Sequence, residues 1–202
     1  MANRREGAGR RTNAERTATT RGEILSAAIA AFGTRGFHKA SLQEIAAAAG
    51  VTPAGLLHHF GSKNQLLTEL LAHRDGSEIA EVNDPERPYG TDFLDHLAAT
   101  AERNSRRRGV TQLYAVLSAE GVTDDHPAQD YFRARYDGLR RMIADEIRTA
   151  QAAGDLPAGP DPVRVATLVI AAMDGLQIQW LYDPEAVDMG SLIRDLITAL
   201  TR

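Results

Sequence analysis

The chain has 202 residues and an apolar share of 43%, enough for one large or two modest globular domains. It contains no cysteine, which excludes disulfides and thiolate metal sites and suits a reducing compartment. The N-terminus is arginine-rich and lacks the apolar segment of a secretory signal. The most apolar run, 165–173, is far shorter than the ~20 residues that span a bilayer. We therefore expect a soluble cytoplasmic protein.

The net charge of −4 is unevenly distributed along the chain. Residues 1–63 contain nine Lys and Arg against four Glu, a net charge of +5, whereas the remainder carries 14 basic and 23 acidic side chains, a net charge of −9. A basic front joined to an acidic body is typical of an anion-binding module attached to a part that stays off the anion. Residues 1–19 hold five arginines and, after Met1, no large apolar side chain, so we expect a disordered basic arm. The arm follows DNA phosphates, enters a minor groove or is an inert tail.

A capping box of Thr20 and Glu23 predicts the start of the first helix, and Gly36 predicts its end. The apolar side chains between them recur at helical spacing: Ile24, Leu25, Ala28, Ile29 and Phe32. This helix can cover the back of the two helices that follow.

The stretch 41–67 predicts two short helices joined by a tight turn. A capping box opens the first of them at Ser41, and Gly50 can adopt the left-handed conformation that ends a helix. Thr52 and Pro53 then serve as the cap and the first residue of the second helix. A helix, a short glycine-containing turn and a second helix form the helix-turn-helix, which lays its second helix in the DNA major groove.

A longer helix opens at Ser62 and runs to about Glu81, which would link a head to a body. After a loop at 83–90, helical patterns cover 92–107, 109–120, 127–153, 162–182 and 188–201. No segment shows strand alternation. The sequence thus predicts an all-α protein with a three-helix helix-turn-helix head at 20–65 and a larger helical body at 66–202.

With these features the chain resembles the tetracycline-repressor (TetR) family of bacterial transcription regulators. The resemblance covers about residues 20–70 and rests on Ile45, Ala46, Ala49, Gly50, Val51, Thr52, Leu56, Leu57, His59, Phe60, Ser62, Lys63 and Leu66. Leu57 replaces a tyrosine that commonly contacts phosphate in this family, so His58 or His59 is the alternative source of that contact. Ala54 stands where the family has glycine, and Gly55 follows it.

The residues expected to contact DNA are Ser41, Gln43, Thr52, Pro53, Ala54, Gly55, Leu57, His58, His59 and Lys63. Thr52, His58 and Gln43 carry the polar groups for base contacts. Lys63 lies in the first turn of its helix, where the dipole disfavours a cation unless an anion is bound, and the resemblance implies that it grips phosphate. We expect no metal site at His58–His59, because adjacent helical side chains diverge by about 100°.

The helix predicted at 162–182 is apolar nearly all round and must be covered on more than one side. Two such helices per chain would form a four-helix dimer interface, as the resemblance implies, with Ala171, Gly175, Leu192, Ile193, Leu196, Ile197 and Leu200. A monomer that hides these stripes in its own core is the alternative. A small-molecule pocket would be lined by Phe93, Tyr114, Phe132, Tyr136, Met173, Gln177 and Trp180. The same side chains would also make an ordinary core, although Asp174 and Gln177 need polar partners.

The resemblance implies a homodimeric DNA-binding regulator, a repressor, that binds a palindromic operator and is released by a small-molecule effector. Release would follow a tilt of the helix 63–81. The alternative is a dimeric DNA-binding regulator whose body responds to a protein partner or to no ligand. No motif places a nucleophile beside a base and no phosphate-binding loop is present, so we expect neither an enzyme nor a cofactor.

Overall fold

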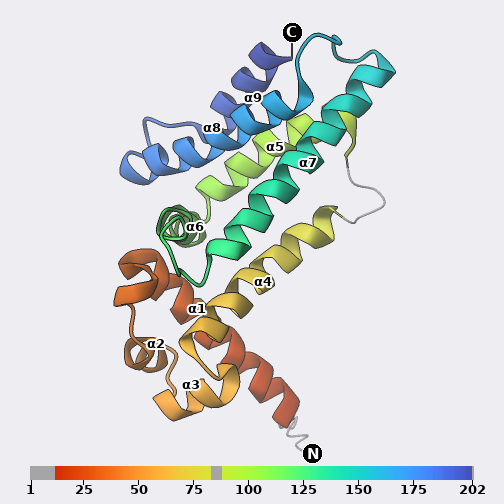
Figure 1. The fold of residues 1–202 in the computed structure, drawn as a ribbon. Helices are drawn as coiled ribbons and strands as arrows, with labels where there is room; N and C mark the ends of the chain where they lie inside the picture. The colour runs from red at the N-terminus through yellow and green to blue at the C-terminus, as the bar shows by residue number, and fades with distance from the viewer. Residues whose placement is uncertain (1–11, 83–87, 202) are drawn as a thin grey trace, which may run out of the picture.

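The chain is helical throughout the part that the structure describes. The computed structural model describes residues 12–82 and 88–201, which form nine helices and no strand (Figure 1). The helices are α1 (Asn13–Lys39), α2 (Leu42–Ala48), α3 (Pro53–Phe60), α4 (Lys63–Val82), α5 (Gly90–Ser105), α6 (Arg108–Glu120), α7 (Gln129–Ala153), α8 (Pro162–Tyr182) and α9 (Met189–Leu200). In Figure 1, α1–α3 and the start of α4 form a lower lobe, the head, and α5–α9 form an upper lobe, the body. The all-α prediction is confirmed.

The helix-turn-helix begins and ends where its capping residues predict. The Ser41 hydroxyl accepts the backbone N–H of Glu44 at 3.1 Å, and the Glu44 carboxylate accepts the backbone N–H of Ser41 at 3.2 Å. Gly50 follows α2 with φ of 67°, in the left-handed region that favours glycine. The Thr52 hydroxyl caps α3 by accepting the N–H of Gly55 at 3.0 Å. These bonds satisfy free N–H groups at both helix starts and so fix the turn between them.

The first helix starts earlier than the sequence predicted. The predicted cap at Thr20 is wrong, because Thr12 caps the helix: its hydroxyl accepts the Glu15 N–H at 3.2 Å and its own N–H donates to the Glu15 carboxylate at 2.7 Å. Residues 13–19 contain neither glycine nor proline, so nothing interrupts the helix between the two candidate caps. The end of the predicted arm is therefore helical, and residues 1–11 lie outside the described residues.

Two hydrophobic cores hold the molecule together. The first joins buried side chains of α1–α4 to Leu113 and Leu117 of α6 and to Phe132 of α7. The second lies among α5, α7, α8 and α9. The most extensive contact between head and body is that of α1 with α6. Gly33 permits this close approach, since a Cβ there would lie 3.3 Å from the backbone nitrogen of Leu113.

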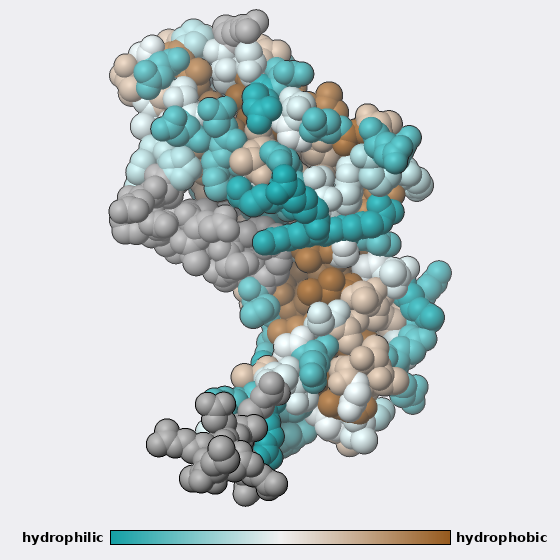
Figure 2. All heavy atoms as spheres, turned by 180° about the vertical axis from the view of Figure 1, so that it is seen from behind, coloured by the Kyte–Doolittle hydropathy of each residue, from teal (hydrophilic) through white to brown (hydrophobic). Residues whose placement is uncertain are grey.

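The helices of the body start and end within two residues of their predicted bounds. The predicted loop at 83–90 falls mostly on residues outside the described part, and α5 begins at Gly90. Among the described helices, α8 alone is long and apolar enough to cross a membrane by length and composition, which the shorter run 165–173 did not indicate. Seen from behind, apolar residues are exposed at the waist between head and body (Figure 2).

Candidate functional site

The second helix of the helix-turn-helix, α3, has one open side and one buried side. The open side carries Thr52, Pro53, Ala54, Leu57 and His58, all exposed, whereas Gly55 and His59 are half-buried. On the buried side, Leu56 and Phe60 belong to the first core. The Arg21 guanidinium holds α3 from behind, because it donates to the His59 carbonyl at 2.6 Å and lies 4.3 Å from the centre of the Phe60 ring. A braced helix with an open side is what docking into a major groove requires.

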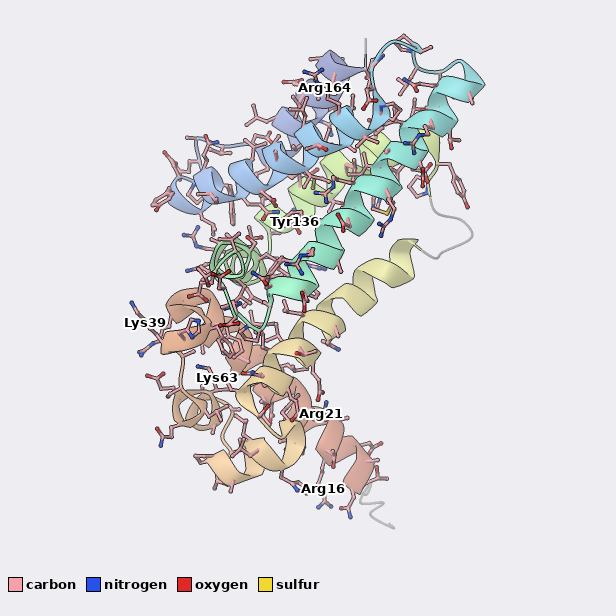
Figure 3. The ribbon with its side chains drawn as sticks, viewed as in Figure 1. Arg16, Arg21, Lys39, Lys63, Tyr136 and Arg164 are labelled. Carbon is pink, nitrogen blue, oxygen red and sulfur yellow. The ribbon has the colours of Figure 1, made fainter. Side chains whose placement is uncertain are left out.

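Lys63, predicted to grip a DNA phosphate, is turned toward the end of α1 (Figure 3). Its ammonium donates to the His38 carbonyl at 3.3 Å and lies 4.5 Å from the centre of the Phe37 ring. Burial lowers the pKa of Lys63, and the nearby Glu120 carboxylate opposes this shift. An ammonium has three N–H donors, so the bond to His38 leaves two of them for another acceptor. Of the other predicted DNA contacts, Ser41 is half-buried and Gln43 exposed at the start of α2.

Glu120, at the end of α6, is attached to a break in α1. Gly36 has φ of 72° and ψ of 173°, a conformation almost restricted to glycine, and a Cβ there would overlap the Glu120 carboxylate. The next N–H, of Phe37, donates to that carboxylate at 2.6 Å. Nε2 of the buried His126 lies 3.6 Å from the same carboxylate, and Nδ1 accepts the N–H of Ala128 at 3.2 Å. We call Gly36, Phe37, Glu120 and His126 the junction.

A cavity of about 160 Å³ lies in the body where the two cores meet. Its wall includes Phe132 from the first core and Phe93 from the second. Tyr136 of α7 also lines it and packs against both cores (Figure 3). A molecule in this cavity would therefore contact both cores at once.

The helix α6 links the cavity to the head. Tyr114 and Ser118 line the cavity, whereas Leu113 and Leu117 are buried against the head in the first core. The same helix ends at Glu120, which binds the backbone of α1 in the junction. A shift of α6 would therefore change its contacts with α1.

The cavity combines apolar walls with a few polar groups. Asp174 accepts a hydrogen bond from the Tyr136 hydroxyl at 2.7 Å. Burial raises the pKa of Asp174, whereas this hydrogen bond and the charge of Arg135 act in the opposite direction. Burial and the bond to Asp174 also raise the pKa of Tyr136 to about 12. The Arg135 guanidinium lies 4.9 Å from the centre of the Tyr114 ring.

The structure brings together six of the seven residues predicted to line a pocket: Phe93, Tyr114, Phe132, Tyr136, Met173 and Gln177. Trp180 does not line the cavity, because it is buried in the second core with the Arg108 guanidinium 5.5 Å from its ring centre. Sequence analysis missed other lining groups: His96, Thr100, Asn104, Ser118 and Arg135. These polar residues lie on helices whose partners the sequence did not reveal.

The predicted dimer residues are divided between surface and core. Ala171 and Leu192 are exposed and Gly175, Leu196 and Leu200 half-buried, whereas Ile193 and Ile197 are buried in the second core because α9 packs on α5. The exposed large apolar side chains on α8 are Val163, Leu168, Ile178 and Tyr182. Leu168, Ala171, Gly175, Ile178 and Tyr182 recur every three or four residues and so share one face of α8. Ala171 and Gly175 of this face were predicted from the sequence, whereas Leu168 and Ile178 were not. The described residues contain no group of three His, Cys, Asp or Glu able to hold a metal ion.

A helix-turn-helix with an open second helix, joined to a helical body with an internal cavity, defines a DNA-binding transcription regulator. Two family models agree with this: "Bacterial regulatory proteins, tetR family" matches residues 24–70, and "BetI-type transcriptional repressor, C-terminal" matches residues 93–202. The chain belongs to the TetR family. It is a transcription regulator and not an enzyme.

Relatives and solved structures show the same family and fold. The HTH-type transcriptional regulator TtgR of Pseudomonas putida is 29% identical over 192 residues, which covers 89% of this chain and 88% of the relative. The SmeT–triclosan complex superposes with a TM-score of 0.76 at 21% identity and covers 91% of this chain and 92% of its own. A putative regulator from Saccharomonospora viridis in complex with choline gives a TM-score of 0.75 at 24% identity, with 90% and 96% covered.

Proposed function

We propose that this regulator is a homodimeric repressor that binds a palindromic operator and leaves it when a small molecule fills the body cavity. The observation that carries the proposal is the position of the cavity, between the two cores and against the helix that binds the head. The complexes of structural neighbours with triclosan and choline support a small-molecule ligand, since they occur on the same fold. The cavity favours this function over a body that answers to no ligand.

Release would follow from a population shift between two positions of α6. A ligand that contacts Tyr114 and Ser118 displaces α6. On its other side α6 packs Leu117 against the head, and at its end Glu120 binds the backbone at the break in α1. Preference of the ligand for the displaced form by about 100-fold supplies roughly 2.7 kcal/mol of coupling. The sequence predicted that α4 connects the body to the head, and the contact of α1 with α6 adds a second connection.

The exposed apolar stripe on α8 supports the homodimer. Together with Leu192 on α9, this stripe leaves large apolar side chains in water on one pair of adjacent helices. Pairing about a two-fold axis would cover them and place two α3 helices in successive major grooves, ~34–36 Å apart. The double substitution Leu192→Asp and Leu196→Asp should give monomers, because charges buried in an apolar interface are costly.

The test begins with an operator selected from random duplexes and a compound screened for release of the protein from it. Thr100→Trp fills the cavity, and Asp95→Trp places the same side chain on the exposed face of the same helix as the control. We expect both variants to bind the operator, and we expect only Thr100→Trp to ignore the compound. Release of Thr100→Trp at an unchanged concentration would place the effector elsewhere. A selection that recovers no two-fold sequence would contradict the dimeric operator.

A further inference from the structure

Among the described residues that line the cavity, Asp174 is the one acidic side chain. It lies in the middle of α8, where its neighbours along the helix are apolar, and it is half-buried. Among the described residues, Tyr136 is its one hydrogen-bond donor, at 2.7 Å from Oδ2. A carboxylate can accept about four hydrogen bonds, so this group keeps most of its acceptor capacity inside the cavity.

The positive charge nearby offsets only part of the cost of burying this carboxylate. Arg135 lines the same cavity, but its guanidinium lies over the Tyr114 ring, 4.9 Å from the centre. The pKa of Asp174 is raised because its burial outweighs both Arg135 and the Tyr136 bond. The other titratable side chains that the described part of the wall contains are His96, Tyr114 and Tyr136. The site therefore favours an additional positive charge close to Asp174.

The rest of the wall suits an apolar body attached to that charge. Phe93, Tyr114, Phe132 and Tyr136 contribute four aromatic rings, and Leu97, Leu139, Ile143, Ile170 and Met173 contribute aliphatic surface. Ring faces attract cations, so aromatic rings around a buried carboxylate stabilise an ammonium in addition to the ion pair. An anionic ligand would meet the same carboxylate with repulsion.

We propose that the cavity selects a protonated organic amine with an aromatic or aliphatic body, whose N–H donates to the Asp174 carboxylate beside Tyr136. This inference rests on the proposed function of the cavity as an effector site and adds the chemical class of the effector. The choline-bound neighbour shares only the fold, at 24% identity. The other role open to Asp174, a purely structural bond to Tyr136, makes a different prediction for ligand binding.

The experiment measures by calorimetry the binding of three probes that differ at one end: 4-phenylbutylamine, 4-phenylbutan-1-ol and 4-phenylbutyrate. The proteins are the full-length wild type, Asp174→Asn, and Asp130→Asn as the control. Asp174→Asn keeps the shape and removes the cost of a buried charge, so it should fold. Asp130 is an exposed α7 carboxylate, with 91% of its side chain accessible, away from the cavity.

We expect the wild type and Asp130→Asn to bind the amine at least about tenfold more tightly than the alcohol, and the carboxylate least tightly. In Asp174→Asn the amine should lose this advantage while the alcohol keeps its affinity. Amine affinity should also fall as the pH drops through the pKa of Asp174, because the protonated carboxyl offers no charge, and the affinity of the alcohol should stay constant.

Equal or tighter binding of the alcohol or the carboxylate by the wild type overturns the amine proposal, as does an amine preference that survives Asp174→Asn. Failure of all three probes to bind overturns it as well. None of these results touches the proposed function, which the Thr100→Trp variant tests with whichever compound releases the operator. If Thr100→Trp still responds to that compound while the amine binds at Asp174, the cavity is an amine site but not the effector site.

Discussion

The two hydrophobic cores differ in what they join. The second core is closed within the body, where α5, α7, α8 and α9 pack on one another. The first core is shared: its side chains come from the head, yet Leu113, Leu117 and Phe132 belong to helices of the body. The DNA-binding head is therefore not a self-contained unit attached by a linker. It depends on α6 for part of its own interior.

Under the proposed function, this difference is the means by which a cavity in the body would act on DNA binding. If each lobe had a core of its own, a ligand bound between the two cores could push the lobes apart without deforming either core. Here the wall of the cavity includes Phe132 of the first core and the side of α6 that carries Tyr114 and Ser118, so a ligand there would strain the head directly. The cavity and the DNA-binding head are coupled if a ligand changes the relative free energies of two packed arrangements. Because the first core includes side chains of both lobes, the head would take a different position in each arrangement.

The clearest test of this difference between the cores is to truncate one leucine in each of them. Leu117 and Leu94 are both buried, at 0% and 4% exposure, and truncation to alanine should cost about 3–5 kcal/mol at either site. We expect only Leu117→Ala to increase amide hydrogen exchange in α1 and to weaken operator binding, by about tenfold. If α1 exchanges equally in both variants, the head does not depend on α6 for the packing of its interior.

A second, smaller effect tests the junction. Gly36→Ala should cost about 2–3 kcal/mol, because φ of 72° with ψ of 173° disfavours a side chain and the new Cβ would overlap Glu120. Gly154→Ala is the control, since Gly154 has φ of 84° at the end of α7 but open space around it, and about 1 kcal/mol is expected there. Urea unfolding measures both. Equal losses would mean that Glu120 moves aside freely and does not fix the α1 break.

Local sequence signals predicted the helices well and their contacts poorly. The cap at Ser41, the glycine at 50 and the Thr52–Pro53 start each act within a few residues, so the helix-turn-helix could be predicted without knowledge of the rest. The cap of α1 was missed because Thr12 and Thr20 begin equally good capping boxes, and only the continuous helix between them distinguishes the two.

The site outside the head depends on contacts between distant residues. Glu120 and Phe37 are 83 positions apart, and neither has a local pattern that marks it as a partner of the other. Asp174 could be singled out as a polar group in an apolar helix, but its partner Tyr136 lies on another helix. Trp180 was placed on the cavity face by helical spacing, yet it lies nearly one turn beyond Gln177, the last residue of α8 that lines the cavity, and it is buried in the second core.

The smallest predicted effect concerns pH and the buried imidazole of the junction. Burial is the largest influence on His126 and lowers its pKa below the ordinary 6.5, with His38 acting in the same direction and Glu120 opposing. Its Nδ1 accepts the Ala128 N–H, so protonation of the ring would also break that bond. The unfolded chain therefore binds the proton more readily than the folded protein does. Because of this difference, stability contributed at this site is complete above about pH 6.5 and declines as the pH falls below it.

His126→Asn separates this effect from the other titrating groups, because Oδ1 of Asn can occupy the place of Nδ1 and accept the Ala128 N–H. We expect the variant to be less stable than the wild type at neutral pH, since it loses the ring contact with Phe37, and to show a smaller loss of stability on acidification. His58→Asn, at an exposed position of α3, should leave the pH dependence of the wild type unchanged. Urea unfolding between about pH 5 and pH 8 gives both slopes. An unaltered slope in His126→Asn would show that the junction does not take up a proton in this range, and the sensitivity of the shared core to pH would then have to come from other groups.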